Sequence, residues 1–420
     1  MKVCVIGSGG REHALAWRLS ISPSVTKVYA IPGSAAMSDC AELVGIDWQQ
    51  SDHLISFLKD NQVDLVVVGP EAPLVAGLAD VLTKAGIPVF GPSKAAAQLE
   101  GSKVFAKDLM KKYNIPTAAY GVFHKVDEAK AFIAQTGAPI VVKADGLAAG
   151  KGVVVAMTID EANVAVEDML SGNRFGDAGS TVVIEEFMEG EEASLLAFVD
   201  GKTVVPMIAS QDHKRIFDGD KGPNTGGMGT YAPAPVLTDA LRDAAMKTIL
   251  EPMVAAMEKE GMPYVGCLYA GLMITDEGPK VVEFNARFGD PETQVVLPLL
   301  DSDLGEIMMA CAKGTLTSNM VKWKDSSAAC VILASKGYPE TSSKGDVISG
   351  DIKQYDTTIV FHSGTKLVGE NYVTNGGRVL GVVGLGKDLR TALDRAYRRI
   401  EHIDFEGMQY RTDIGAKAFK

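Results

Sequence analysis

Strand and helix signals alternate through the first 100 residues, and this alternation constrains the fold more than any other feature of the 420-residue chain. Buried strands are expected at residues 2–7, 27–31, 63–68 and 89–90, with helical segments between them. Repeated strand–helix units fold as a parallel sheet with helices on both faces. The pattern therefore predicts a Rossmann-like α/β domain over residues 1–100.

The turn after the first strand is rich in glycine but departs from the dinucleotide-binding fingerprint. Its sequence is GSGGRE at residues 7–12, so Glu12 stands where G-x-G-x-x-G requires the third glycine. The second strand also lacks a closing acidic residue for a ribose. What remains is a helix start beside Arg11 that suits a phosphate-sized anion, held by backbone N–H groups and the helix dipole. Glycines that only allow close helix–strand packing are the alternative.

Charge and cysteine content exclude several classes of partner. The chain has 53 acidic and 41 basic residues, a net charge of −12, which gives no global attraction for nucleic acid or acidic membrane surfaces. Five scattered cysteines without a C-x-x-C pair indicate a reducing compartment, and six histidines show no zinc-ligand spacing. Neither a signal peptide nor a membrane-spanning run is expected. We expect a cytoplasmic protein that holds anionic ligands through local clusters.

The most concentrated chemistry lies in PKVVEFNARFGDPETQ, residues 279–294. A short apolar run after a Gly-Pro turn predicts a strand, whose alternation puts Glu283, Asn285 and Arg287 on one face. A carboxylate and an amide oxygen two residues apart suit a hard divalent cation such as Mg²⁺. Arg287 can hold an anion beside that cation, and Asp290 and Glu292 follow closely. A polar strand end with solvated charges is the alternative interpretation.

Two further segments of the central region indicate a nucleotide. A strand at 139–144 and another at 153–156 flank DGLAAGKG, residues 145–152, a glycine-rich loop that could fold over phosphates. A strand at 181–184 then leads into an acidic linker, where free backbone groups can bind an adenine edge and Phe187 and Met188 supply apolar contact. A flexible hairpin and a solvated acidic turn are the respective alternatives.

The remaining segments predict substrate contacts and a closing domain. QDHKR at 211–215 adjoins GPNTGGMG at 222–229, whose N–H groups could bind a carboxylate or phosphate, although a long surface loop is the alternative. Residues 328–420 read as a small α+β module with strands at 328–334 and 377–384 and an amphipathic helix at 389–400. No catalytic constellation is evident there, so it is interpreted as a packing and site-closing domain.

Taken together, these motifs resemble those of the phosphoribosylamine–glycine ligases, also called glycinamide ribonucleotide synthetases, of the ATP-grasp superfamily. The most specific segments are residues 7–13, 143–152, 222–229 and 285–292, and the resemblance covers essentially the whole chain. It implies a Rossmann-like domain at 1–100, an ATP-grasp α+β domain at 101–327 with a nucleotide-covering subdomain at about 120–192, and a small α+β domain at 328–420.

The resemblance also implies the reaction: ATP, glycine and 5-phosphoribosylamine give ADP, phosphate and glycinamide ribonucleotide, a step of purine biosynthesis, through glycyl phosphate. Mg²⁺ or Mn²⁺ would assist, and the partners are small molecules, with a monomer as the expected state. Another ATP-grasp ligase or a carboxylase component would share the nucleotide half. A nicotinamide dehydrogenase conflicts with Glu12, and a nucleotide sensor would not need the Glu283/Asn285 pair.

Residue roles follow from the same resemblance. The metal ligands would be Glu283 and Asn285. The ATP-binding residues would be Lys103, Lys143, Gly150, Lys151, Gly152, Glu185, Glu186, Phe187 and Glu192. The substrate-binding residues would be Gly9, Gly10, Arg11, Gly226, Gly227, Asp290 and Glu292, and the catalytic residues Asp212, Lys214 and Arg287.

Overall fold

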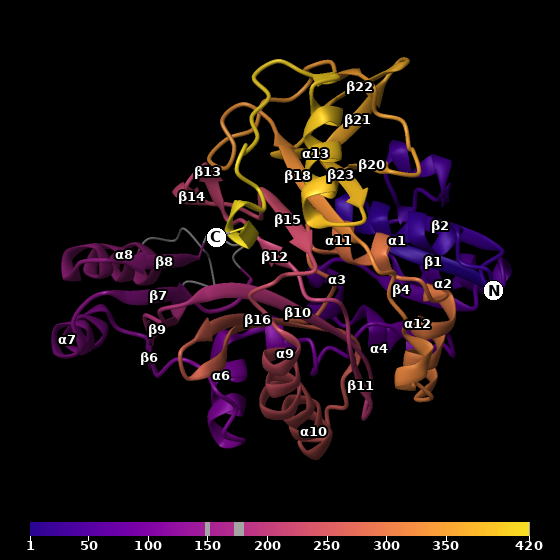
Figure 1. Ribbon diagram of the computed structural model, residues 1–420. Helices are drawn as coiled ribbons and strands as arrows, with labels where there is room; N and C mark the ends of the chain where they lie inside the picture. Colours follow the sequence, from indigo (N-terminus) through magenta and orange to yellow (C-terminus); the bar gives the residue numbers. More distant parts are fainter. Residues whose placement is uncertain (148–151, 172–179, 420) are drawn as a thin grey trace.

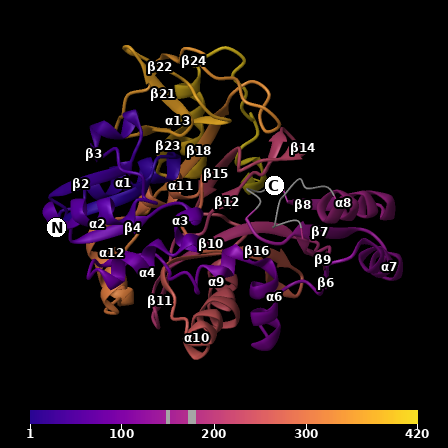
Figure 2. The same ribbon diagram turned by 180° about the vertical axis from the view of Figure 1, so that it is seen from behind.

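The computed structural model describes residues 1–147, 152–171 and 180–419. Figure 1 shows the N-terminal sheet on one side of a central sheet, with the C-terminal region above them. A smaller sheet bearing two helices projects on the opposite side from the N-terminal region, and the view from behind agrees (Figure 2). This α/β architecture in three parts confirms the expected fold class.

The N-terminal sheet is parallel throughout, with strand order β3-β2-β1-β4-β5. Its strands are β1 (Lys2–Gly7), β2 (Lys27–Pro32), β3 (Glu42–Leu43), β4 (Leu65–Val68) and β5 (Val89–Phe90). The helices that alternate with them are α1 (Gly10–Ser20), α2 (Ser51–Asp60), α3 (Glu71–Ala76) and α4 (Leu78–Lys84). The interior residues of β1, β2 and β4 are buried, as expected for parallel strands covered on both faces.

The projecting sheet is antiparallel, with order β6-β9-β7-β8. It consists of β6 (Tyr120–Phe123), β7 (Ile140–Ala144), β8 (Val153–Ala156) and β9 (Val182–Glu186). Ile140 and Val142 pack with α7 (Val126–Thr136) and α8 (Ile159–Ser171) in a separate core. The alternate residues Val141 and Lys143 therefore point to the other face, away from the helices.

The central sheet has order β11-β10-β16-β17. Its strands are β10 (Glu191–Asp200), β11 (Val204–Pro206), β16 (Val265–Thr275) and β17 (Gly278–Asn285). The helices associated with it are α5 (Gln98–Gly101), α6 (Lys103–Lys112), α9 (Asp239–Ala245), the π-helix η3 (Met246–Leu250) and α10 (Glu251–Lys259). Gly271 pairs with Glu283 whereas Leu272 pairs with Val281, so Val282 is an extra residue in a β-bulge of β17.

The C-terminal sheet has order β12-β15-β18-β23-β20 and includes two strands from before residue 233. Its strands are β12 (Gln211–Asp212), β15 (Gly229–Ala232), β18 (Ser327–Ala334), β20 (Thr358–His362) and β23 (Arg378–Gly386), with α13 (Leu389–Ile400) packed on them. The short paired strands are β13 (Arg215–Phe217) with β14 (Lys221–Asn224), β21 (Thr365–Val368) with β22 (Asn371–Thr374), and β19 (Ser349–Gly350) with β24 (Ile403–Asp404). Helices α11 (Thr293–Val296) and α12 (Leu304–Lys313) lie in sequence between β17 of the central sheet and β18 of the C-terminal sheet. The short 3₁₀ helices are η1 (Ala35–Asp39), η4 (Leu297–Leu299), η5 (Ser318–Met320) and η6 (Ala416–Phe419).

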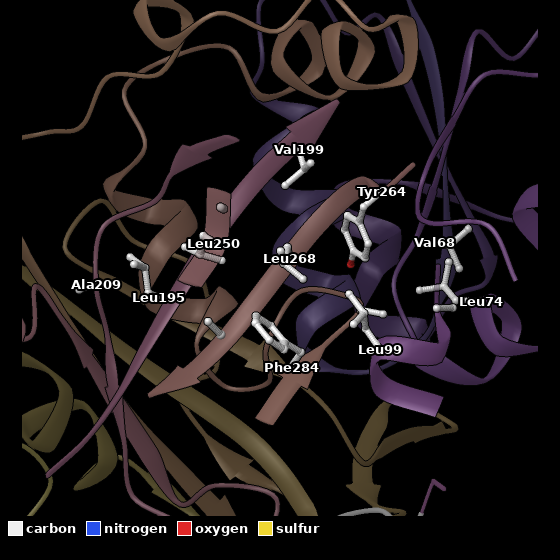
Figure 3. Close-up of a cluster of buried hydrophobic side chains, with 14 of the residues drawn as sticks. Val68, Leu74, Leu99, Leu195, Val199, Ala209, Leu250, Tyr264, Leu268 and Phe284 are labelled. Carbon is white, nitrogen blue, oxygen red and sulfur yellow. The ribbon is translucent and has the colours of Figure 1, made fainter. Parts of the chain in front are cut away.

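One hydrophobic core joins the N-terminal, central and C-terminal sheets. Figure 3 shows Val68, Leu74 and Leu99 on the N-terminal side of a cluster that includes Leu268 and Phe284 of the central sheet. All five are at most 5% exposed. The sheets therefore bury apolar surface against each other, which fixes their relative positions.

Within the part of the chain that the structure describes, we find no helix long and apolar enough to cross a membrane.

Close packing of α13 on β23 depends on a glycine. A Cβ at Gly384 would collide with the carbonyl oxygen of Ala392 and lie 2.7 Å from the nitrogen of Ala396, both backbone atoms of α13. We expect Gly384→Ala to destabilise the protein by roughly 1–3 kcal/mol, because the helix must move away from the sheet. Thermal unfolding measures this effect. Gly45→Ala is the matched control, because Gly45 is exposed with open space around it. Equal melting temperatures for the two variants would contradict the packing argument.

Candidate active site

Two adjoining cavities form one cleft between the projecting sheet and the central sheet. The inner cavity has a volume of about 320 Å³ and the outer one about 550 Å³. The residues that line both are Lys143, Val153, Glu185, Asp212, Lys214, Thr225, Val282 and Glu283. Most of the predicted site residues that the structure describes line this cleft, although they come from segments far apart in the chain.

Glu283 and Asn285 lie side by side in the inner cavity, as the strand pattern predicts. Asn285 Nδ2 is 3.5 Å from Glu283 Oε1. Burial raises the pKa of Glu283, but Lys214, Lys143 and Lys103 more than offset this, so the pKa lies below its ordinary value and the carboxylate is ionised at neutral pH. Among the residues that can be described, no three His, Cys, Asp or Glu side chains cluster as metal ligands. The Glu283 carboxylate and the Asn285 amide offer oxygen ligands of the kind that a Mg²⁺-type cation takes, and such a cation would need further oxygen ligands from water or substrate.

Lysine side chains from two elements converge on one buried carboxylate. Lys143 Nζ of β7 and Lys107 Nζ of α6 lie 3.0 Å and 2.9 Å from Glu185 Oε2. Lys143 also donates to the carbonyl oxygen of Val282 at 3.2 Å. Glu185 thus belongs to a buried ionic network and not to a solvated acidic turn. Lys107 was not identified from the sequence, because its spacing resembles that of the exposed lysines on the same helix.

The start of the glycine-rich loop is tied to the N-terminus of α6. The carboxylate of Asp145 accepts hydrogen bonds from the backbone N–H groups of Lys103 and Val104 at 2.6 and 3.2 Å. Lys103 Nζ donates to the carbonyl oxygen of Gly146 at 2.9 Å. Burial lowers the pKa of Lys103. Gly152 lines the inner cavity, whereas the predicted phosphate-binding residues Gly150 and Lys151 lie outside the described residues.

The outer cavity combines apolar walls with the predicted adenine-binding linker. Val141 and Val155 of the projecting sheet and Met273 of the central sheet line it. Glu186, Phe187 and the rest of the linker through Gly190 complete the wall. The carboxylate of Glu192 pairs with Lys214 at 2.7 Å. This cavity has the size and the mainly apolar character of a site for a planar base.

The hairpin of β13 and β14 closes another side of the outer cavity and is held by residues 411–417. Arg411 is buried and pairs with Asp220 at 2.8 Å and with Asp413 at 2.7 Å. Lys417 also pairs with Asp220, at 2.7 Å, and both of these residues line the cavity. We call these contacts the C-terminal clasp. The C-terminal region thus contributes Lys417 to the wall of the outer cavity.

Asp212 and Lys214 form a charged cluster with Glu192 at the junction of the two cavities. Lys214 Nζ lies 3.5 Å from Asp212 Oδ1. Burial, together with the nearby carboxylates of Glu292 and Glu192, raises the pKa of Asp212 to about 7 against the opposing charge of Lys214. Burial alone would lower the pKa of Lys214, but Asp212 and Glu192 reverse this and raise it. An acid that titrates near neutrality beside a cation suits proton transfer.

Arg287 is positioned by carboxylates from the N-terminal region. Its Nη2 lies 2.9 Å from Glu100 Oε1, and its Nε lies 3.4 Å from Glu71 Oε2. Arg11 Nη1 lies 3.7 Å from the same Glu71 oxygen. Burial would lower the pKa of Arg287, but Glu100 and Glu71 raise it. Neither Glu71 nor Glu100 was identified from the sequence, where no motif marks them.

Glu292 and Asp290 differ in their surroundings. Glu292 Oε1 accepts hydrogen bonds from the hydroxyl groups of Tyr269 at 2.7 Å and Ser194 at 3.3 Å. Asp290 Oδ2 lies 3.5 Å from Arg378 Nη2, and Arg378 also donates to the carbonyl oxygens of Asp290 and Gly226, both at 2.7 Å. Arg378 is a further cavity-lining residue that the sequence analysis missed. Its position directly after Gly376-Gly377, at the start of a strand, was the available signal.

Backbone N–H groups expected to be free for an anion are already bonded in three places. The N–H of Gly9 donates to Glu12 Oε2 at 2.8 Å, that of Gly226 to the Tyr338 hydroxyl at 3.0 Å, and that of Gly227 to Thr225 Oγ1 at 3.0 Å. Close packing explains these glycines, because a Cβ at Gly226 would meet Arg378 and one at Gly227 would meet Pro291. The expectation that these N–H groups are free for an anion is therefore wrong, although a substrate contact through other atoms of Gly9, Gly226 and Gly227 stays a prediction.

Comparisons with known proteins agree on one family. Models of phosphoribosylglycinamide synthetase match residues 1–100 (N domain), 101–293 (ATP-grasp domain) and 328–417 (C domain). A phosphoribosylamine–glycine ligase of Halalkalibacterium halodurans is 53% identical over 418 residues, covering 100% of this chain and 97% of that protein. The crystal structure of a phosphoribosylamine–glycine ligase from Thermotoga maritima has a TM-score of 0.87 at 34% identity, covering 99% and 100% of the two chains. A biotin carboxylase from Campylobacter jejuni, covering 97% and 92%, has a TM-score of 0.75 at 15% identity, which shows the shared fold alone.

The raised pKa of Asp212 has a consequence for stability. Between its ordinary pKa of 3.8 and the folded value of about 7, the folded state retains a proton that the unfolded state releases. Stability contributed by this group is therefore full at low pH and is lost as the pH rises towards 7. Asp212→Asn removes this titration. The melting temperature of the variant, relative to the unmodified protein, should rise from about pH 4 to about pH 8.

Asp276→Asn is the control for this measurement, because Asp276 is exposed. Its difference from the unmodified protein should not change with pH. If the Asp212→Asn difference is also constant between the two pH values, the burial of Asp212 has no effect on its titration in solution.

Proposed function

The chain belongs to the phosphoribosylglycinamide synthetase family, and on that premise we propose that it ligates glycine to 5-phosphoribosylamine with ATP, in purine biosynthesis. The products are glycinamide ribonucleotide, ADP and phosphate. One observation carries the proposal: Lys103, Lys143 and Lys214 keep Glu283 ionised, and Glu283 lines both the mainly apolar outer cavity and the inner cavity, where many charged side chains meet. An enzyme with this role acts in the cytoplasm, and all five cysteines are free thiols.

Activation of glycine as glycyl phosphate accounts for the residues in the cleft. A carboxylate is a poor acyl donor, because its leaving group would be oxide. Phosphorylation by ATP converts that oxygen into part of a phosphate leaving group, which the amine of phosphoribosylamine displaces. The main obstacle is the approach of the glycine carboxylate to a polyanion, and positive charge in a fixed cleft reduces it. Positioning and charge then supply most of the rate without a protein nucleophile.

The nucleotide half of the cleft has a defined set of proposed contacts. The base would lie in the outer cavity against Phe187 and the linker from Glu185 to Glu186, with Glu192 near the ribose. Lys103 and Lys143 would contact the phosphates, together with the loop residues Gly150, Lys151 and Gly152. A divalent cation held by Glu283 and Asn285 would supply additional positive charge at the phosphate oxygens.

The substrate half lies around the inner cavity. Arg287 would neutralise the carboxylate of the bound glycine before phosphorylation, and Lys214 the phosphate that departs when the amide forms. Asp212, with a pKa of about 7, is suited to accept the proton that the amine releases as the amide forms. Gly10 and Arg11 would lie near the ribose phosphate, and Asp290 and Glu292 near the amine and ribose.

An isotope experiment tests both the reaction and its intermediate. With glycine labelled by ¹⁸O in its carboxylate, each turnover should transfer one labelled oxygen to the released phosphate, because that oxygen attacks the γ-phosphorus and leaves with it. ADP release should require both glycine and phosphoribosylamine. Mass spectrometry of the phosphate measures the label. Phosphate without label, formed alongside the amide product, would exclude glycyl phosphate, and ADP release without a requirement for glycine would exclude the reaction.

Replacement of Glu283 tests the proposed metal ligands. Glu283→Gln keeps the shape of the side chain but removes its charge, so turnover should fall by about two orders of magnitude or more. The apparent Kd for Mn²⁺ in the presence of ADP, measured by electron paramagnetic resonance, should rise in parallel. Glu277→Gln at the exposed turn before β17 is the control, because the Glu277 carboxylate pairs with Lys280 and lines neither cavity. Unchanged Mn²⁺ affinity in Glu283→Gln would remove Glu283 from the metal site.

A further inference from the structure

Lys107 lies in the middle of α6 with its ammonium group buried in the wall of the cleft. Its side chain is 3% exposed, and Nζ contacts Glu185 Oε2 at 2.9 Å and Thr117 Oγ1 at 2.8 Å. The hydroxyl of Thr117 donates in turn to the carbonyl oxygen of Val281 at 2.7 Å. Lys107 therefore links the projecting sheet, through β9, to β17 of the central sheet. A fully buried ammonium needs such partners, because burial opposes its charge.

The carboxylate that Lys107 holds has one oxygen occupied and one free. Glu185 Oε2 accepts from both Lys107 and Lys143, whereas Glu185 Oε1 is buried without a hydrogen-bond partner among the described residues. Buried polar atoms in folded proteins almost always have a partner, so an orphaned oxygen on a residue that lines a cavity points to a ligand group. Glu185 lines both cavities of the cleft. Because an ionised carboxylate accepts hydrogen bonds and cannot donate them, the missing group must be a donor.

Resting on the proposed function, we infer that Lys107 is a positioning residue that selects the nucleotide base, by holding Glu185 so that Oε1 accepts from the 6-amino group of adenine. Glu185 lies at the inner end of the apolar outer cavity, where a base would lie. Adenine presents an N–H donor at this edge, whereas guanine and hypoxanthine present a carbonyl oxygen. A 6-oxo base would place two acceptors against each other, and sites built around a specific hydrogen bond strongly reject such analogues.

Lys107 holds the carboxylate of Glu185 in its orientation. Burial lowers the pKa of Lys107 to about 8, while Glu185 opposes this shift, so the ammonium is mostly charged at neutral pH. Without Lys107, Glu185 Oε2 would retain Lys143 as its one cationic partner among the described residues. The carboxylate would then be held from one side and could rotate. Rotation would remove Oε1 from the edge of the base and admit a 6-oxo base.

Calorimetric titration of ADP and IDP in the presence of Mg²⁺ tests the inference, because these nucleotides differ at the relevant edge of the base. The unmodified protein should prefer ADP, and Lys107→Met should reduce that preference by about tenfold or more. Glu185→Gln should do the same, because the amide can donate to the 6-oxo group. The double variant Lys107→Met/Glu185→Gln should lose no more of the ADP preference than Glu185→Gln alone, since both changes act through the one hydrogen bond from the base to Glu185 Oε1. Lys111→Met, at an exposed position of α6, is the control and should keep the preference.

Several outcomes would overturn the inference. One is an unchanged ADP-over-IDP preference in Lys107→Met. Another is a double variant whose loss of preference equals the sum of the losses in the two single variants. Either result would leave Lys107 with a purely structural role. If Lys107→Met does not fold, Glu185→Gln decides the matter, and an unchanged preference there rejects the role of Glu185 Oε1. Nucleotide binding needs neither glycine nor phosphoribosylamine. A protein that prefers ADP but forms no amide would refute the proposed function and leave the inference about base selection standing. A competent ligase that binds ADP and IDP equally would refute the inference and leave the proposed function standing.

Discussion

The pairing of Arg287 with Glu100 and Glu71 is the interaction on which the rest of the site depends. Glu100 does two things at once: Oε1 pairs with Arg287 at 2.9 Å, and Oε2 accepts the backbone N–H of Ala286 at 2.7 Å. The chain just beyond β17 is thereby fixed to α5, and Asn285 and Glu283 are fixed with it. Breaking a buried pair by removing one partner typically costs about 3–5 kcal/mol, because an unpaired charge remains. The arrangement of the metal pair and of Arg11 thus depends on contacts across the boundary between regions.

Local patterns were sufficient to predict four of the five strands of the N-terminal parallel sheet and the shared face of Glu283 and Asn285 in β17. The buried strands of the first region are read from short apolar runs between glycine-rich turns, a signal that does not depend on distant residues. In β17 the alternation of side chains placed Glu283 beside Asn285, which the structure confirms. The bulge at Val282 was not foreseen, but it precedes both residues, so their shared face is unaffected.

What the sequence could not reveal depends on long-range contact. Lys107 and Lys111 occupy the same helix, and only burial beneath Glu185 distinguishes the first from the second. Arg378 reaches Gly226 across 152 positions of sequence. The glycine-rich segment at 222–229 was correctly recognised as unusual, yet a sequence cannot show whether an N–H group is free or already bonded to Tyr338 or Thr225. These contacts form only when the sheets pack against one another, so a local sequence pattern does not reveal them.

The C-terminal clasp has a consequence for the order in which the cleft is built during synthesis. Arg411 donates a hydrogen bond to Asp220, which lies 191 positions earlier in the sequence. The backbone N–H of Thr412 donates to Asp218, 194 positions earlier. At ribosomal rates of about 5–20 residues per second, the β13–β14 hairpin therefore waits roughly 10–40 s for the segment that holds it. A nascent chain has its glycine-rich segments and most of its lysines before one wall of the outer cavity can form. The outer cavity therefore has its complete lining only after Lys417 has been synthesised, near the end of the chain.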